Sequence, residues 1–417
     1  MIMEKAILVT VDFKNEQNWP VEDRASELRE LARSSGASVE GEVICRRDKA
    51  TPDLFIGKGK FEELILLAKT KRIDLVIFNN ELTPTQLRNI EAGLSNNKIN
   101  HKVLDRTQLI LDIFAQHAKS MEGKIQVELA QLEYLLPRLT GRGVGLSRLG
   151  GGIGTRGPGE QMLESDRRRI RQRVSKLKKE LINLETRRGA LRKRRRDAML
   201  VSIAIVGYTN AGKTTLLNRF TNSKKLVADK LFSTLDPIAR TYSLPNNLKV
   251  LFNDTVGFLH NLPHFLIESF KATLEEVKEA DLLIHVLDAS NPKIDEYNDA
   301  VYEVLKELEA EKKTIITVLN KIDLMDNAQY LKRLEKKFNN TVSVSALKGD
   351  GIELIIDKIS GLLSEFVTKI KVEIPNNRMA LVNLIYENGN VHKREDRAAS
   401  VYIEATVPTR LRNLLNL

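Results

Sequence analysis

The chain has 417 residues, enough for two to four domains that each bury a core of their own. It carries 66 Lys and Arg against 55 Asp and Glu, a net charge of +11. Residues 138–198 alone hold 19 basic and 6 acidic residues, a balance of +13 that leaves −2 for the rest of the chain. A positive charge confined to one segment favours a polyanionic partner bound at that segment.

The composition excludes several classes of protein. The single cysteine, Cys45, rules out an intramolecular disulfide framework and a cysteine-rich zinc site, and the six histidines show no metal-ligand spacing. The apolar run that follows Lys5 is too short for a signal peptide, and no run approaches the ~18 residues that cross a bilayer. We therefore expect a cytoplasmic protein without an integral membrane segment. As a separate expectation, we take it to act as a monomer.

Residues 1–118 are expected to form a small α/β domain. Short apolar runs alternate with amphipathic stretches, which favours a parallel sheet covered by helices. The predicted strands are Ala6–Val11, Val43–Cys45, Leu75–Phe78 and Lys102–Leu104, and the predicted helices are Val21–Arg33, Phe61–Lys69, Thr83–Leu94 and Arg106–Ala118.

Residues 119–198 have the pattern of an antiparallel helical hairpin. Apolar residues recur at steps of three and four from Met121 to Leu136. From Leu163 to Leu191 they recur at steps of seven, with Val174 and Leu181 between them, which predicts a heptad seam.

A glycine-rich loop, residues 141–160, separates the two predicted helices. It holds nine of the 23 glycines and the three arginines Arg142, Arg148 and Arg156. Such a loop is costly to order and usually needs a partner that holds it. We interpret the loop and the basic helix 161–197 as an arm that binds a polyanionic partner; for the helix, the alternative is an ordinary solvated face.

The second half of the chain returns to strand–helix alternation. Residues 199–365 are predicted to form a doubly wound, mainly parallel sheet, and residues 366–417 a small α/β domain at the carboxyl end. The predicted strands of the large sheet are Val201–Val206, Val250–Asn253, Leu282–Leu287, Thr314–Leu319 and Val342–Val344; the last domain has predicted strands Val367–Ile374 and Ala398–Val407 and a helix Arg378–Glu387.

The first strand of the large sheet runs into a phosphate-binding loop, G-x-x-x-x-G-K-[ST], in the required strand-to-helix setting. Backbone N–H groups at its glycines can close around phosphate oxygens at the positive end of the next helix. Lys213 is expected to bridge the β- and γ-phosphates, and the Thr214 hydroxyl to bind Mg²⁺. The residues assigned here to the nucleotide are Gly207, Tyr208, Thr209, Asn210, Ala211, Gly212, Lys213, Thr214 and Thr215.

A second element, Asp254-Thr255-Val256-Gly257, follows the next predicted strand. Asp254 can hold Mg²⁺ through water, and Gly257 lets its N–H approach the γ-phosphate. Thr234 is the candidate for a mobile threonine that binds Mg²⁺ only beside a γ-phosphate, and Thr241 is a weaker alternative. The predicted catalytic residues are therefore Lys213, Thr234 and Gly257, and the predicted metal ligands are Thr214, Thr234 and Asp254.

The third element, Asn320-Lys321-Ile322-Asp323, points to guanine. The Asp323 carboxylate can accept hydrogen bonds from N1–H and the 2-amino group, and adenine offers neither donor. Lys321 can lie over the base while Asn320 braces the loop. In Ser345-Ala346-Leu347, a backbone N–H can meet the guanine O6. Together the elements predict a Mg²⁺-dependent domain that binds and hydrolyses GTP.

Two positions depart from the Ras-like pattern. Where a glutamine usually orients the attacking water, this chain has Phe258, which cannot form that hydrogen bond. We therefore expect slow intrinsic hydrolysis. Asn210 is similar to the asparagine of GTPases in which K⁺ replaces an arginine finger; the alternative is an asparagine that braces the loop.

With these motifs, nearly the whole chain resembles the HflX family of translation GTPases. The matching stretches outside the nucleotide motifs are Phe55–Lys60, Val103–Thr107 with Leu109–Ala115, Gly150–Glu160 and Leu231–Asp236. The glycine loop and hairpin ahead of the nucleotide domain are the most specific feature.

The resemblance implies a GTPase that binds the large ribosomal subunit and its rRNA near the peptidyl-transferase centre and splits or rescues ribosomes stalled by heat or antibiotics. It also implies a weak ATP site in the first domain, for which Gly57–Lys60 is the local candidate; a structural turn or an RNA contact is the alternative. A second functional hypothesis is a GTP-gated assembly or hibernation factor, in which hydrolysis is incidental.

Overall fold

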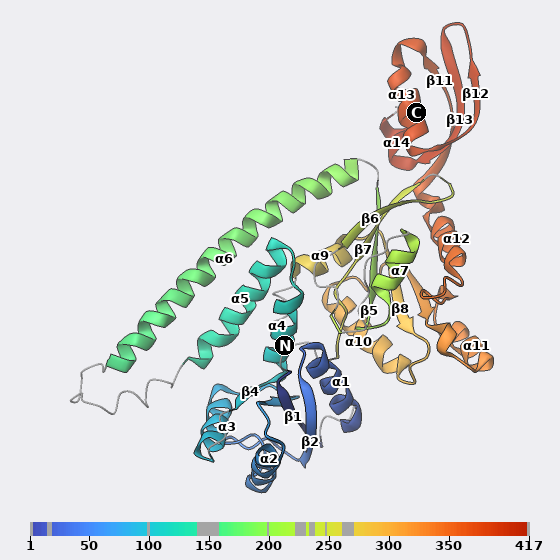
Figure 1. Ribbon diagram of the computed structural model, residues 1–417. Helices are drawn as coiled ribbons and strands as arrows, with labels where there is room; N and C mark the ends of the chain where they lie inside the picture. Colours follow the sequence, from blue (N-terminus) through green and yellow to red (C-terminus); the bar gives the residue numbers. More distant parts are fainter. Residues whose placement is uncertain are drawn as a thin grey trace. The chain divides into compact units, whose positions relative to one another are not determined.

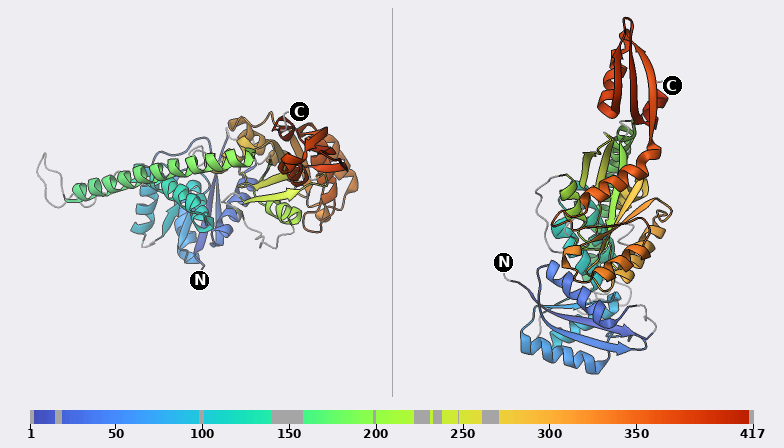
Figure 2. Two further views of the ribbon diagram at one scale, coloured as in Figure 1. Left: turned by 90° about the horizontal axis from the view of Figure 1, so that it is seen from above. Right: turned by 90° about the vertical axis from the view of Figure 1, so that its right-hand side faces the viewer.

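The computed structural model describes residues 3–14, 19–97, 101–139, 158–197, 200–221, 231–232, 238–246, 248–260 and 271–414 (Figures 1 and 2). They form two compact units. The first holds the described residues up to Leu184 together with Leu231 and Phe232. The second holds the remaining residues from Glu185 onward.

The first unit begins with a four-stranded parallel sheet in the order β2-β1-β3-β4, as the sequence predicted. Strand β2 extends well beyond its predicted core because its first five residues are only half-buried, so they lack an apolar run. The bounds are β1 (Lys5–Phe13), β2 (Ser38–Arg47), β3 (Leu75–Phe78) and β4 (Lys102–Leu104), with helices α1 (Val21–Ser34), α2 (Lys58–Lys71), α3 (Pro84–Asn96) and α4 (Arg106–His117).

Side-chain caps fix where two of these helices begin. Thr83 and Gln86 form a reciprocal capping box at α3, and the Asp105 carboxylate accepts from the Gln108 N–H at α4. Helices α2 and α3 bury their apolar faces on one side of the sheet around Phe78. Arg106, at the start of α4, forms a buried ion pair with Glu27 of α1 at 2.5 Å.

Two residues that lie far along the chain belong to this unit. The Phe232 ring packs edge-on against Phe114 of α4, with centroids 4.6 Å apart. The Leu231 N–H donates to the Ser34 hydroxyl at 3.0 Å. Both Leu231 and Phe232 are buried, so this short segment is part of the first unit's packing although the sequence places it between two nucleotide motifs.

The hairpin is formed by α5 (Met121–Arg138) and α6 (Pro158–Asp197), which lie side by side and run antiparallel (Figures 1 and 2). Leu177 is fully buried against Ile125 and Leu129, which confirms the central part of the predicted seam. Helix α5 has 18 residues and α6 has 40, so α5 can cover only part of α6.

The predicted loop 141–160 is too long at its carboxyl end. Helix α6 begins at Pro158, so residues 158–160 are helical. Proline favours the first position of a helix because its missing N–H would have no helical partner there. Residues 141–157, with Arg142, Arg148 and Arg156, lie outside the described residues.

The second unit contains a six-stranded sheet in the order β10-β9-β8-β5-β7-β6. All neighbouring strands are parallel except β6, which runs antiparallel to β7. The bounds are β5 (Val201–Gly207), β6 (Ile238–Ser243), β7 (Lys249–Asp254), β8 (Leu282–Asp288), β9 (Ile315–Asn320) and β10 (Thr341–Ser343), with helices α7 (Lys213–Phe220), α9 (Lys271–Glu279), α10 (Ile294–Glu307), α11 (Ala328–Lys337) and α12 (Ile352–Leu362).

The sequence predicted five strands for this sheet and missed the sixth, the edge strand β6. Its residues alternate between half-buried and exposed, so it has no continuous apolar run of the kind that marks the buried strands. A search for apolar runs therefore finds the five parallel strands and passes over the antiparallel edge.

The last part of the chain is a three-stranded antiparallel sheet in the order β11-β13-β12. Strand β12 was also absent from the prediction, because its sequence is almost entirely polar and charged. The bounds are β11 (Val367–Pro375), β12 (Asn390–Asp396) and β13 (Ser400–Pro408), with helices α13 (Met379–Asn388) and α14 (Thr409–Leu414). Among the residues that the structure describes, no helix is both long and apolar enough to span a bilayer.

Candidate functional site

The phosphate-binding loop joins β5 to α7, and two of its glycines are required by its geometry. Gly207 and Gly212 have φ angles of 152° and 96°, which side-chain-bearing residues rarely adopt. A Cβ at Gly207 would collide with the Val286 carbonyl, and one at Gly212 with the Asn320 side chain. Asn210 also has a positive φ, and its exposed side chain forms no hydrogen bond within the described part of the chain.

Lys213 is the first residue of α7 and lies almost completely buried under this loop. Its ammonium group donates to the carbonyl oxygens of Gly207 at 3.1 Å and Tyr208 at 2.7 Å. Burial lowers the pKa of Lys213 to about 8, although the nearby Asp254 carboxylate acts in the opposite direction. A buried cation whose hydrogen bonds within the described residues go to carbonyl dipoles favours an incoming anion.

The predicted metal ligands Thr214 and Asp254 lie together. The Thr214 hydroxyl donates to Asp254 Oδ2 at 2.7 Å, and Asp254 is fully buried at the end of β7. A hydroxyl beside a carboxylate is a donor set that fits Mg²⁺, which prefers oxygen ligands. Thr234, the third predicted ligand, lies outside the described residues, and Thr241 lies within β6 opposite Leu251, with its side chain exposed.

Gly257 lies next to the lysine. A Cβ at this position would be 2.8 Å from Thr209 Cγ2 and 3.0 Å from Lys213 Nζ, so the site has room only for glycine. The following residue, Phe258, turns its ring into the core and is 1% exposed. Its backbone N–H donates to the Gly207 carbonyl at 3.1 Å, and its carbonyl accepts from the Thr209 N–H at 2.9 Å. Phe258 therefore joins this segment to the loop and offers nothing to a water molecule.

The Asn320 amide links the phosphate loop to the predicted base-binding loops. Its Nδ2 donates to the Ala211 carbonyl at 2.8 Å, and its Oδ1 accepts from the Ala346 N–H at 3.0 Å. The next residue, Lys321, has a φ of 64°, and its ammonium group pairs with Asp288 at 2.7 Å. This ion pair holds the lysine at the edge of the sheet where the base is expected.

Asp323 and the Ser345–Leu347 segment meet at the same edge. The Ser345 hydroxyl donates to Asp323 Oδ1 at 2.6 Å. The Arg219 guanidinium, from α7, donates to the carbonyls of Ala346 and Leu347. The loop is thus held from both sides, with its backbone fixed near the carboxylate that we predict to read guanine.

Sequence reasoning missed three residues of this region: Asp288, Arg219 and Tyr297. Asp288 ends β8 beside Asn320, so its place at a carboxyl edge of the sheet was a usable signal. The Arg219 contacts span more than 120 positions of sequence, and no local sequence pattern predicts them. Tyr297 stacks on the loop residue Tyr208, which only the structure reveals.

The second predicted nucleotide site, Gly57–Lys60, forms the start of α2. The Arg47 guanidinium lies where a Cβ of Gly57 would be, and Lys60 forms an ion pair with Glu63 at 2.7 Å. The contact with Arg47 explains why position 57 is a glycine, since a side chain there would collide with the guanidinium. An ATP site at this position stays a hypothesis.

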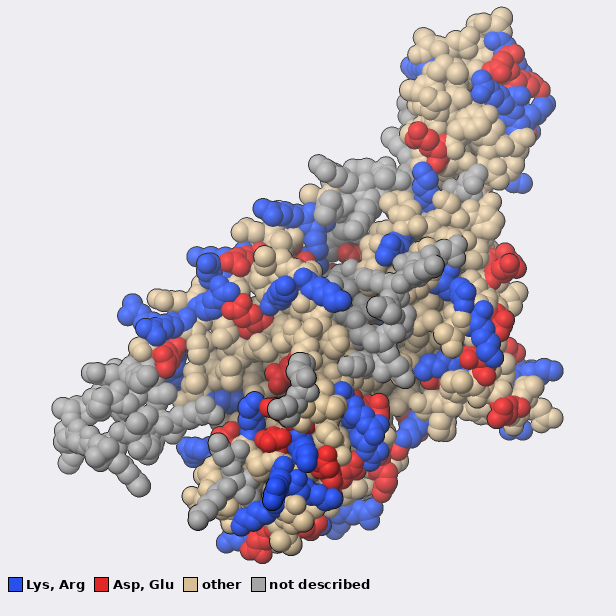
Figure 3. Space-filling model, in the orientation of Figure 1, with Lys and Arg blue, Asp and Glu red and all other residues tan. Residues whose placement is uncertain are grey.

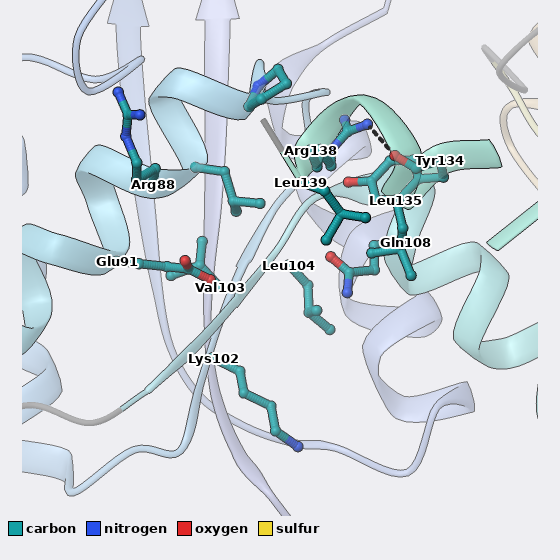
Figure 4. A pocket seen from close by; sticks show the side chains of 12 residues that line it. Arg88, Glu91, Lys102, Val103, Leu104, Gln108, Tyr134, Leu135, Arg138 and Leu139 are labelled. Atoms are coloured by element: carbon teal, nitrogen blue, oxygen red, sulfur yellow. Dashed lines mark hydrogen bonds between the residues drawn. The ribbon is translucent and has the colours of Figure 1, made fainter. Parts of the chain in front are cut away.

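A cavity of about 150 Å³ lies elsewhere in the first unit, between α3, β4 and the end of α5 (Figure 4). Leu104, Leu135 and Leu139 give it an apolar lining, and Arg88 and Lys102 add positive charge. None of its lining residues belongs to the nucleotide motifs.

A six-stranded sheet with a phosphate loop, a buried acidic residue at the next strand end and an N-K-x-D loop defines a P-loop guanine-nucleotide-binding domain. Four family models match the chain in series: "GTP-binding GTPase N-terminal" over residues 22–115, "GTP-binding GTPase Middle Region" over 117–195, "50S ribosome-binding GTPase" over 202–321 and "HflX C-terminal domain" over 330–412. The chain belongs to the HflX family of GTPases.

Two relatives that are GTPase HflX proteins support this assignment over nearly their full length. A GTPase HflX of Caldanaerobacter subterraneus subsp. tengcongensis is 44% identical over 416 residues, covering 99% of this chain and 94% of the relative. GTPase HflX of Escherichia coli K12 is 37% identical over 408 residues, covering 97% and 94%. A crystal structure of an SsGBP–GDP complex is 27% identical with a TM-score of 0.46, covering 87% of this chain and 99% of that one. The protein is a GTP-binding, GTP-hydrolysing enzyme.

Proposed function

We propose that the protein, in its GTP form, binds the large ribosomal subunit through rRNA and splits or rescues stalled ribosomes. The observation that carries this proposal is the basic surface of α6. Its exposed cations have no acidic counterpart of similar number, and RNA phosphates attract such a surface. The family model matched by residues 202–321 is described as a ribosome-binding GTPase, which supports the same partner. We place the activity in the cytoplasm and expect the protein to act as a monomer.

Part of the α6 charge is already neutralised by α5. Arg173 forms a two-pronged ion pair with Glu128, at 2.6 and 2.7 Å, and holds the pKa of that carboxyl below its usual range. Lys178 pairs with Glu133 at 2.7 Å. Figure 3 shows the blue side chains along the arm with a few red ones between them. Within the described part of α6, the cations left exposed to a partner without a close ion pair are Arg168, Arg171, Lys176, Lys179 and Arg187.

For the reaction we assign roles to the residues of the site. The Lys213 ammonium group exchanges its two carbonyl partners for oxygens of the β- and γ-phosphates. The Gly257 N–H faces the γ-phosphate. Thr214 and Asp254, with Thr234, hold Mg²⁺, which when bound neutralises charge on the phosphates. Asp323 reads the guanine edge, while Lys321 and the Ser345–Leu347 backbone enclose the base. The residues proposed to contact GTP are Gly207, Tyr208, Thr209, Asn210, Ala211, Gly212, Lys213, Thr214, Thr215, Asp254, Gly257, Asn320, Lys321, Asp323, Ser345, Ala346 and Leu347.

Ribosome contact is expected to speed hydrolysis. The residue at the usual glutamine position, Phe258, is buried in the core and cannot orient water. Another group must therefore supply that function, and contact with the ribosome is the simplest way to couple hydrolysis to arrival at the target. Hydrolysis then resets the protein to a weakly binding GDP form.

The second hypothesis, an assembly or hibernation factor, differs in what activates turnover. An assembly factor responds more strongly to immature subunits than to intact or stalled ribosomes. Comparing GTP turnover with immature large subunits, mature subunits and stalled ribosomes at equal concentration separates the two hypotheses.

Binding to large subunits should depend on the nucleotide and on the α6 cations. In pelleting assays, we expect the protein to sediment with mature large subunits in a non-hydrolysable GTP analogue and to stay in the supernatant with GDP. Changing Arg168, Arg171 and Lys179 together to glutamine should weaken this binding at least about tenfold. It should also lower the slope of log affinity against log salt by about three, one for each phosphate that the protein no longer neutralises.

The matched control places the same change of charge on α11. Lys332, Arg333 and Lys336 are exposed there, and their replacement by glutamine should leave binding and its salt slope unchanged. Equal weakening by both triple variants would show that net charge alone matters. Equal sedimentation with GDP and with the analogue would contradict a GTP-gated ribosome ligand.

Potassium is a proposed activator of hydrolysis. Asn210 does not brace the loop through its side chain within the described residues, so it is free to ligate a cation at the phosphates. We expect GTP turnover to be several-fold faster in KCl than in NaCl at equal ionic strength, and Asn210→Ala to remove the difference. Equal turnover in the two salts would rule out K⁺ activation.

A further inference from the structure

Tyr208, the second residue of the phosphate loop, has a side chain that phosphate binding does not use. Its ring is 4% exposed and lies parallel to the Tyr297 ring, with centroids 4.0 Å apart and planes 5° apart. Its hydroxyl oxygen accepts a hydrogen bond from the His260 backbone N–H at 3.0 Å. Because Tyr297 lies in the first turn of α10, the side chain joins this helix to the segment that follows Gly257.

The hydroxyl contact extends a short ladder between the loop and that segment. Two backbone hydrogen bonds already join Phe258 to the loop: its N–H donates to Gly207, and its carbonyl accepts from Thr209. The Tyr208 hydroxyl adds a third bond two residues later, at His260. On the other side of Gly257, the Thr255 hydroxyl donates to the Ile205 carbonyl of β5 at 2.7 Å. Gly257 is therefore held from both directions by groups of β5 and the loop.

From this geometry we propose that Tyr208 is a positioning residue for GTP hydrolysis. Its hydroxyl fixes the backbone at His260, the parallel Tyr297 ring fixes the Tyr208 ring, and the Gly257 N–H is thereby kept in place at the γ-phosphate. In the reaction, water oxygen bonds to the γ-phosphorus and the bond from phosphorus to the β–γ bridging oxygen breaks. The electron pair leaves with GDP, and the water proton passes to the released phosphate.

The effect should fall on the chemical step and not on GTP affinity. Ground-state binding is spread over the Lys213 ammonium, the loop amides and the base contacts, none of which Tyr208 holds through its hydroxyl. A fixed N–H group contributes to rate when it stabilises the charge that shifts onto phosphate oxygens in the transition state. Loosening the segment after Gly257 lowers that contribution first.

Tyr208→Phe removes the hydroxyl and keeps the stacked ring. We expect the single-turnover hydrolysis rate at saturating GTP to fall about fivefold, the effect of one ordinary hydrogen bond. GTP affinity should change less than twofold, and hydrogen exchange at the His260 amide should become faster. The control is Tyr330→Phe on α11, which also removes a tyrosine hydroxyl and should change none of the three measurements.

A second variant keeps the proposal testable if Tyr208→Phe folds poorly. Tyr297→Leu removes the stacking partner while leaving the hydroxyl, and it should show the same combination of slower hydrolysis, faster His260 exchange and unchanged affinity. An unchanged hydrolysis rate in Tyr208→Phe with faster His260 exchange would overturn the positioning role. Unchanged hydrogen exchange at the His260 amide would show that the hydrogen bond to Tyr208 does not protect it. An equal loss of hydrolysis rate and GTP affinity would show that Tyr208 has only a structural role.

Discussion

Replacing Lys213 by methionine should weaken GTP binding by roughly a hundredfold or more and should make the nucleotide-free protein more stable. The first effect follows from the loss of charge-assisted hydrogen bonds to phosphate, worth about 3 kcal/mol. The second follows because a buried ammonium is costly without an anion, and its removal relieves a cost on the order of 1–3 kcal/mol. Isothermal titration with GTP and thermal unfolding without nucleotide measure the two effects.

The two carbonyls that Lys213 contacts are not stranded by this change. The Gly207 carbonyl also accepts from the Phe258 N–H at 3.1 Å, and the Tyr208 carbonyl from the Ala211 N–H at 3.3 Å. The methionine side chain fills most of the lysine volume, so no large cavity forms. Lys336→Met on the exposed face of α11 is the control and should leave both measurements unchanged. A destabilised Lys213→Met protein would contradict the view that the buried charge is a cost in the empty site.

The lowered pKa of Lys213 also makes the lysine's contribution to stability depend on pH. In the unfolded chain the lysine titrates near 10.5, and in the nucleotide-free fold burial lowers its pKa to about 8. Between these values the unfolded state binds more protons, so this lysine's contribution to stability rises with pH across that window. The advantage of Lys213→Met over the wild-type protein should therefore shrink as the pH is raised above 8.

GTP affinity should change in the opposite direction over the same range. Phosphates favour the charged ammonium, so binding above pH 8 must take up a proton. From the pKa of about 8, affinity should fall roughly tenfold between pH 7 and pH 9. Titration in buffers with different ionisation enthalpies reports the proton uptake directly, and its absence at pH 9 would contradict a neutral lysine in the empty site.

Asp323→Asn should change the preferred base from guanine to xanthine. The carboxylate accepts hydrogen bonds from two guanine donors, N1–H and the 2-amino group. An amide offers one acceptor and one donor, so its NH₂ group would face a guanine donor. We expect GTP affinity to fall on the order of a hundredfold and XTP affinity to rise by a comparable factor. Competition binding with GTP, XTP and ATP measures the switch.

The neighbourhood of Asp323 favours this outcome over simple loss of binding. The Ser345 hydroxyl donates to Oδ1 and can donate equally to an amide oxygen, which leaves the amide nitrogen for the xanthine 2-oxygen. Asp326→Asn makes the same chemical change three residues later at an exposed position and serves as the control. Unchanged preference for GTP in Asp323→Asn would refute the assignment of this residue to the base.

The phosphate loop and the Asn320–Asp323 loop could be predicted because each is a contiguous motif at the end of an apolar strand. The same reasoning found the parallel strands, since strands buried on both faces read as apolar runs. It missed β6 and β12 because edge strands lie half in solvent and carry polar side chains. Their places are set by pairing with β7 and β13, which only the folded chain shows. The boundaries of the four predicted domains stay a prediction.

The contacts that shape the site were harder to predict than its motifs. Arg219 and Ala346 are separated by 127 positions, and their contact depends on how α7 and the last loops pack. The stacking of Tyr208 on Tyr297 has the same origin. In the hairpin, the seam pattern correctly placed Leu177 in the contact, but it could not reveal that α5 covers only part of α6.

The two hydrogen bonds of the Asn320 amide make the ends of the nucleotide pocket thermodynamically dependent on each other. One bond holds the phosphate loop at Ala211, and the other holds the Ser345–Leu347 segment at Ala346, so neither segment can shift without straining the same buried side chain. Coupling of this kind is reciprocal: whatever the base gains from occupied phosphate contacts, the phosphates gain from a bound base. We therefore expect guanosine to bind more tightly when inorganic pyrophosphate is bound, and pyrophosphate to bind more tightly when guanosine is bound.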